Sequence, residues 1–215
     1  CSLGTAWVGN FLQETPEPPG GGTNFVLPAP LGRDGNTRPA LGERLVLRVL
    51  PAGNTTLDWA CTTFAGRGPG SRRVSELLAE QFLPPAGLVA LPWLTRPNPF
   101  APAGGGAGLL GATAHTRRAD LLRACVAGLC FAFAHALKPV LKAGRIDAVL
   151  LTGGASRSAA VRNLLAALLH PAPVQAPADG DLAGAGRSVW RFAPAAACRP
   201  SEPVPGPSQA THQDV

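Results

Sequence analysis

The chain has 215 residues, of which 46% are hydrophobic, so it is long enough to bury a core as one large domain or two small ones. Its formal net charge of +6 comes mostly from scattered arginines, with no long basic run and no alternation with aromatic residues. This pattern argues against nucleic-acid binding and suits a small anionic ligand. The scattered arginines include Arg33, Arg38, Arg44, Arg48, Arg67, Arg72, Arg73, Arg117 and Arg118.

The cysteines indicate a reducing compartment and argue against a zinc site. There are five, with no Cys-x-x-Cys pair and no set of nearby histidines. An odd number of cysteines without a targeting segment predicts free thiols and a cytoplasmic protein. They are Cys1, Cys61, Cys125, Cys130 and Cys198.

Two further features concern membranes and the start of the chain. The longest apolar run, Ala124 to Ala134, is too short to cross a bilayer and stops at His135, so no membrane partner is expected. The chain starts at Cys1 and contains no methionine, which leads us to expect a fragment of a longer protein.

The first fifty residues predict an antiparallel unit of three strands. Trp7, Val8 and Phe11 favour a strand from Ser2 to Leu12, which Gly4 and Thr5 interrupt near its start. Further strands are expected over Asn24–Leu27 and Leu45–Leu50, the latter next to an edge of the sheet.

The next segment predicts two short helices. Asn54 or Thr55 can cap the first, which carries apolar residues as far as Ala65 and ends at the glycines that follow. Ser71 to Phe82 has the spacing of a second amphipathic helix.

The middle of the chain combines a stiff loop with a long helix. Three prolines between Pro92 and Pro99 exclude regular structure, and Gly104 to Gly111 is rich in glycine. A helix is expected from about Ala119 to Lys142, apolar on most sides, with Pro139 kinking its last turn.

A strand, a glycine turn and a helix follow in direct succession. Ala148 to Leu151 is typical of a strand buried on both faces, and Gly153 and Gly154 supply a permissive turn. Ser156 or Ser158 can cap the next helix, which extends to Leu169. Free N–H groups at such a turn can bind a phosphate, although most Gly-Gly turns are only connections.

The last forty residues contain weaker signals. Pro173 to Ala176 predicts one more short strand, and Gly184 to Phe192 predicts a final short helix. Pro194 to Val215 is rich in Pro, Ser, Gln and Ala, so we expect a disordered tail.

Four motifs, taken together and in order, resemble the C-terminal lobe of FGGY carbohydrate kinases, and the xylulokinase-like members most. They are Ser-Leu-Gly-Thr from Ser2, the Pro-Trp-Leu-Thr-Arg-Pro-Asn-Pro loop from Pro92, Gly-Leu-Leu-Gly from Gly108 followed by Arg-Ala-Asp-Leu-Leu-Arg-Ala, and Leu-Thr-Gly-Gly-Ala-Ser-Arg-Ser from Leu151. The resemblance covers Cys1 to about Phe192.

The resemblance implies an α/β fold: an actin-like, ribonuclease-H-like ATPase domain with a mixed sheet flanked by helices. That lobe would span residues 1–193, and residues 194–215 would be the tail. Its ligands would be ATP with Mg²⁺, and a sugar held mainly by a second lobe. The protein would be a phosphotransferase acting on a pentulose such as xylulose, and a homodimer is left open.

The resemblance also carries site residues over to this chain. The Gly-Thr motif, the glycine before the long helix and the Gly-Gly-Ala motif would all lie at the nucleotide. These residues are Gly4, Thr5, Gly111, Gly153, Gly154, Ala155, Ser156 and Ser158. No protein ligand for the metal ion is expected among them.

The family's catalytic aspartate would precede Cys1, so the chain alone is expected to phosphorylate no sugar. The chain departs from the family at Ala127, where a glutamate is usual, at Arg187, where a small residue is usual, and at Ser158, where some relatives have asparagine. Two other functions are left open: a non-catalytic nucleotide-binding or regulatory module on the same fold, that is, a decayed kinase, and a basic scaffold for acidic partners.

Overall fold

The computed structural model describes residues 1–13, 24–28, 44–94, 106–143, 146 and 148–176. The strands are β1 (Ser2–Leu3), β2 (Trp7–Gln13), β3 (Asn24–Pro28), β4 (Arg44–Leu50), β5 (Val89–Leu91), β6 (Gly108–Leu110), β7 (Val149–Leu150) and β8 (Val174–Gln175). The helices are α1 (Gly53–Ala60), α2 (Arg72–Glu80), α3 (Arg118–Ala143) and α4 (Ala159–Leu169), with a π-helical turn η1 (Cys61–Ala65) and a 3-10 turn η2 (Gly154–Arg157).

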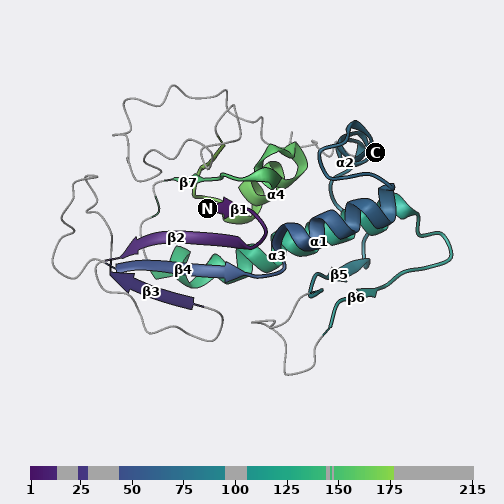
Figure 1. Ribbon diagram of the computed structural model, residues 1–215. Helices are drawn as coiled ribbons and strands as arrows, with labels where there is room; N and C mark the ends of the chain where they lie inside the picture. The colour runs from purple at the N-terminus through teal and green to yellow at the C-terminus, as the bar shows by residue number, and fades with distance from the viewer. Residues whose placement is uncertain (14–23, 29–43, 95–105, 144–145, 147, 177–215) are drawn as a thin grey trace, which may run out of the picture.

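The main sheet is mixed, as predicted. Strands β1, β2, β4 and β3 pair antiparallel in that spatial order, and β7 pairs parallel with β8. A parallel bridge between Ser2 and Thr152 joins the two groups, so the strands follow one another as β8-β7-β1-β2-β4-β3. Figure 1 shows β2, β4 and β3 side by side, with β1 and β7 next to the start of the chain.

The three-stranded unit predicted at the start of the chain is confirmed, with one correction. β4 lies between β2 and the edge strand β3, so it is next to an edge of the sheet, as expected. The correction concerns the first strand. The segment expected as one interrupted strand is instead two strands, β1 and β2, which pair antiparallel with Leu3 opposite Trp7. Gly4 and Thr5 therefore form a reversal of the chain and not a bulge.

Helix α3 is the core of the domain, as its apolar pattern predicts. It extends through Pro139, and every residue from Leu122 to Cys130 is buried. It packs on the sheet, where Trp7 and Phe133 make an edge-to-face contact with ring centroids 5.6 Å apart. By length and composition α3 could also cross a membrane, but the burial of Leu122 to Cys130 and the packing of α3 on the sheet and α1 are those of a core helix.

The first helix differs from the prediction at its start and agrees with it at its end. α1 begins at Gly53 without a side-chain cap, so neither Asn54 nor Thr55 caps it, because the Asn54 side chain is bonded to Trp7 instead. After Ala60 the helix widens into η1 and ends at Gly66, whose φ of 67° is the left-handed conformation that glycine favours. The second helix is confirmed as α2, and Ser71 caps it by accepting a hydrogen bond from the Val74 N–H.

Two segments for which no strand was predicted pair with each other. β5 and β6 form an antiparallel pair that packs on α3, where a side chain at Gly128 would overlap the Ala90 carbonyl oxygen. Ala127, where the family usually has glutamate, is 1% exposed in the core beside this contact. A short side chain at this position matches its burial.

The strand–turn–helix unit is confirmed with an added element. β7, α4 and β8 lie where they were expected, but the 3-10 turn η2 separates the two glycines from α4. Ser158, not Ser156, caps α4 by accepting a hydrogen bond from the Val161 N–H. The predicted helix Gly184–Phe192, the tail Pro194–Val215 and Arg187 lie outside the described residues, as does the loop after Leu94.

Candidate functional site

Three segments that are far apart in sequence meet where β1 joins β7. The Leu3 N–H donates to the Thr152 carbonyl oxygen at 2.7 Å, which places the end of β1 beside the Gly153–Gly154 turn. The Asn54 N–H donates to the Gly4 carbonyl oxygen at 3.1 Å, which places the start of α1 on the same reversal. The fold thus brings Gly4, Thr5 and the glycine turn together.

Gly153 is required by the backbone of the chain itself. Its φ of 90° is accessible mainly to glycine, and a Cβ there would lie 2.8 Å from the carbonyl carbon and oxygen of Leu3. The Ser156 N–H and Oγ–H both donate to the Gly153 carbonyl oxygen, at 3.1 and 2.7 Å. Gly153 and Ser156 therefore build the turn and orient the residues between them.

Gly154 is different, because nothing in the described structure demands a glycine there. It is exposed, its φ lies outside the left-handed region, and a Cβ would make an ordinary contact, 3.5 Å from Asn54 Nδ2. The space beside Gly154 is open to a ligand and is bordered by an amide group.

The rest of the predicted Gly-Gly-Ala motif is internal. Ala155 and Ser156 are buried, and Ser158 is half-buried with its hydroxyl engaged as the cap of α4. The Arg162 guanidinium holds the turn from α4: its Nη1 donates to the carbonyl oxygens of Ser156 and Arg157, each at 2.8 Å. Two arginines, exposed Arg157 and half-buried Arg162, thus give the turn positive charge.

The Gly4–Thr5 reversal is packed tightly against α1. A Cβ at Gly53 would lie 2.5 Å from the Thr5 carbonyl oxygen, so a glycine is needed at the start of the helix. The Thr5 side chain is exposed, and Gly4 is half-buried. A threonine hydroxyl in this position can donate to an anion in solvent.

Gly111 lies in another part of the domain. Its φ is 76°, and a Cβ there would overlap the carbonyl oxygen of Gly87, so Gly111 packs at the end of β6 against the backbone that leads into β5. Figure 1 shows β6 away from β7 and α4. An ATP contact at Gly111 stays a prediction, since its backbone packing already explains the glycine.

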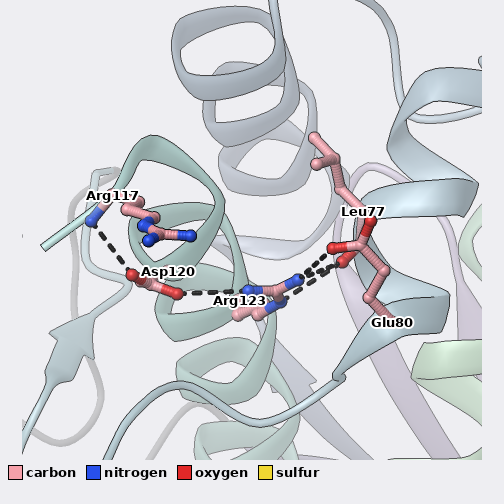
Figure 2. A network of polar contacts seen from close by, with 5 residues as sticks. All are labelled: Leu77, Glu80, Arg117, Asp120 and Arg123. Carbon is pink, nitrogen blue, oxygen red and sulfur yellow. Dashed lines mark hydrogen bonds and ion pairs between the residues drawn. The ribbon is translucent and has the colours of Figure 1, made fainter.

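A polar network centred on buried Arg123 joins α2 to the start of α3 (Figure 2). We call this network the α2–α3 corner. Arg123, 6% exposed, donates to the Leu77 carbonyl oxygen at 2.8 and 3.2 Å, to Asp120 at 3.1 Å and to Glu80 at 3.2 Å. The second Asp120 oxygen accepts from the Arg117 N–H at 3.0 Å. Arg123 satisfies a carbonyl in the last turn of α2 and neutralises Asp120, so the corner is structural.

The sequence did not point to Gly53, Asn54 or Arg162 as site residues, and Asn54 was predicted only as a candidate cap. The Gly-Asn pair before an apolar helix predicts only an ordinary helix cap, and an arginine on α4 predicts only an exposed charge. Only contacts across the fold reveal their roles. Within the described residues no group of three or more His, Cys, Asp or Glu side chains could hold a metal ion.

Comparison with known proteins identifies the fold. The model of the C-terminal domain of the FGGY family of carbohydrate kinases matches residues 1–187. No curated protein matches the chain. Among solved structures, a xylulose kinase from Brucella ovis superposes with a TM-score of 0.66 at 23% identity, covering 84% of this chain and 35% of that one.

Two further structures have the same fold. A Plasmodium falciparum glycerol kinase with ADP gives a TM-score of 0.65 at 12% identity, over 82% of this chain and 34% of that one. A xylulose kinase from Bifidobacterium adolescentis gives a TM-score of 0.57 at 26% identity, over 82% of this chain and 33% of that one. The chain thus spans about a third of the length of these kinases, and the predicted actin-like α/β fold is confirmed.

Proposed function

The chain belongs to the FGGY family of carbohydrate kinases, and on that premise we propose that it forms the ATP-binding half of a cytoplasmic kinase that phosphorylates a sugar hydroxyl. Carbohydrate kinases of this family use ATP. We propose a pentulose such as xylulose as the sugar, since two of the structures described above are xylulose kinases.

One observation carries the proposal: the Gly4–Thr5 reversal, the start of α1 and the Gly153–Gly154 turn meet in one place. Phosphoryl transfer depends mainly on positioning and on stabilisation of charge around the phosphates. The Thr5 hydroxyl can donate to a phosphate oxygen, the exposed Gly154 leaves room for one, and Arg157 adds positive charge. These groups suit a polyanionic nucleotide.

The remaining chemistry would be supplied from outside the described residues. Mg²⁺ is usually held by one or two carboxylates together with phosphate oxygens, and the described residues contain no acidic cluster for it. We propose that the metal ion enters on the nucleotide. The base that removes the hydroxyl proton and most sugar contacts would belong to the rest of a longer protein.

The alternative is a nucleotide-binding module without catalysis, and Ala127 is the observation in its favour. The family's usual glutamate is replaced by a methyl group that is buried in the core. This alternative predicts ATP binding, but no turnover even when a sugar-binding lobe and an aspartate base are joined to the chain.

The test has two measurements on the 215-residue chain. Calorimetric titration should show binding of ATP and ADP, and coupled ADP-release assays with D-xylulose, L-xylulose, D-ribulose and glycerol should stay at background. A folded chain that binds neither nucleotide would contradict the proposal. Sugar-dependent turnover by the chain alone would contradict the assignment of base and sugar contacts to another lobe.

A further inference from the structure

The orientation of the Asn54 side-chain amide is fixed by chemistry. The indole N–H of Trp7, which is fully buried, donates to Asn54 Oδ1 at 3.0 Å. An indole nitrogen is only a donor, so the amide oxygen must face Trp7 and the NH2 group must face the opposite way. The Asn54 N–H bond to Gly4 fixes the backbone of the same residue.

The NH2 group of Asn54 lies beside the open side of the glycine turn. Among the described residues, and apart from the neighbours of Gly154 in the chain, Asn54 Nδ2 is the atom that lies within 4 Å of a Cβ built on Gly154, at 3.5 Å. Within the described part of the chain, Nδ2 makes no hydrogen bond, although Oδ1 and the backbone N–H of the same residue are both engaged. The Asn54 NH2 group therefore borders the space that Gly154 leaves open, and its donors are not used by any described residue.

We propose that the Asn54 amide donates a hydrogen bond to a phosphate oxygen of the nucleotide, with Trp7 as the residue that positions it; this inference rests on the proposed function. A neutral amide already held by Trp7 loses little rotational freedom on binding, which favours a strong contact. Its hydrogen bond to a charged oxygen is of the stronger, charge-assisted kind.

Asn54→Asp separates this contact from the fold. The carboxylate keeps an oxygen for Trp7 and suits the first turn of a helix, so the fold should be retained, but it replaces two donors by a negative charge. Asn54→Ala removes the donors without adding charge. Asn163→Asp places the same charge on the exposed side of α4 and serves as the control.

Binding of ADP and of adenosine to the 215-residue chain is measured in EDTA, so that the new carboxylate cannot recruit Mg²⁺. We expect ADP affinity to fall at least about tenfold in Asn54→Ala and further in Asn54→Asp. Adenosine affinity in both variants, and ADP affinity in Asn163→Asp, should stay within about twofold of wild type.

The outcomes separate the two claims. If the wild-type chain binds no ADP, the proposed function fails. If it binds ADP and a folded Asn54→Asp or Asn54→Ala variant keeps that affinity, the function stands and the role of Asn54 is wrong. An equal loss of ADP and adenosine affinity would also contradict a phosphate contact. Circular dichroism and thermal unfolding establish that each variant is folded.

Discussion

The Gly153–Gly154 turn and the α2–α3 corner both join distant segments through polar contacts, yet they differ in what is left unpaired. In the corner, the Arg123 guanidinium donates hydrogen bonds to Leu77, Asp120 and Glu80, and both Asp120 oxygens accept hydrogen bonds. At the turn, Gly154 and the Asn54 NH2 group border open space.

The difference distinguishes a polar network that only stabilises the fold from a binding site. A buried polar group is costly unless it is paired, so a network that pairs every member serves the fold. A site must hold donors in place and keep some of them free. At the turn, Gly153 and Arg162 fix the backbone. Gly154 and the Asn54 NH2 group border space that a ligand can occupy.

The largest effect is expected from Gly153→Ala. The variant forces a side chain into a conformation that is nearly restricted to glycine and against the Leu3 backbone. The strained conformation costs about 1–3 kcal/mol and the overlap a similar amount, so the free energy of unfolding should fall by about 2–6 kcal/mol. Urea unfolding measures it, with Gly154→Ala as the control. A loss below about 1 kcal/mol would show that the turn can rearrange.

Arg123→Met should break the α2–α3 corner and leave the turn intact. It leaves buried Asp120 Oδ1 without its donor and removes the donors to the half-buried Leu77 carbonyl oxygen, so about 3 kcal/mol of unfolding free energy should be lost. Nucleotide affinity of the folded variant should stay within about twofold of wild type. Arg72→Met, which removes an exposed ion pair to Glu76, should cost under about 0.5 kcal/mol. A large loss of affinity in Arg123→Met would make the corner part of the site.

The sequence predicted most of the fold because its signals are local. The apolar run before Gly153 and the helical spacing after Ser71 each depend on neighbours within one element, and both predictions were confirmed. The pairing of β5 with β6 was missed, since both strands lie among glycines and prolines and are defined by contact with each other.

The site was predictable only in part. Gly4, Thr5 and the glycine turn were placed together by resemblance, and the fold brings them together. Asn54 could not be found, because its role depends on Trp7, 47 residues away in sequence, which holds its amide. The structural reason for Gly111 depends in the same way on Gly87.

The core between the two regions should respond to alkaline pH. Burial raises the pKa of the Cys125 thiol to about 11 and that of Cys61 to about 12, the latter helped by Asp58 and Cys125. A raised pKa means that the thiols stabilise the fold fully below their unfolded pKa of about 8.5, and that this stability is lost as pH rises toward 11–12. Because each thiol ionises in the unfolded chain but not in the folded one, it should lower the free energy of unfolding by about 1 kcal/mol between pH 9 and pH 10.

Urea unfolding at pH 8, 9 and 10 measures this loss, and Cys61→Ala should flatten the pH dependence by one thiol's share. An unchanged slope in that variant would mean that Cys61 ionises in the folded state as easily as in the unfolded one. Nucleotide affinity at pH 8 should not respond to the variant, since Cys61 lies in the core at the start of η1, away from the turn.

Gly154→Ala tests whether the turn binds nucleotide through the space beside Gly154. The methyl group fits the fold, 3.5 Å from Asn54 Nδ2, so the free energy of unfolding should change by less than about 1 kcal/mol. It occupies the place of a phosphate oxygen, so calorimetric titration should show ATP affinity at least about tenfold weaker, a loss of about 1.4 kcal/mol. A well-folded Gly154→Ala chain that binds ATP with wild-type affinity would contradict the account and reduce the turn to a connection between β7 and α4.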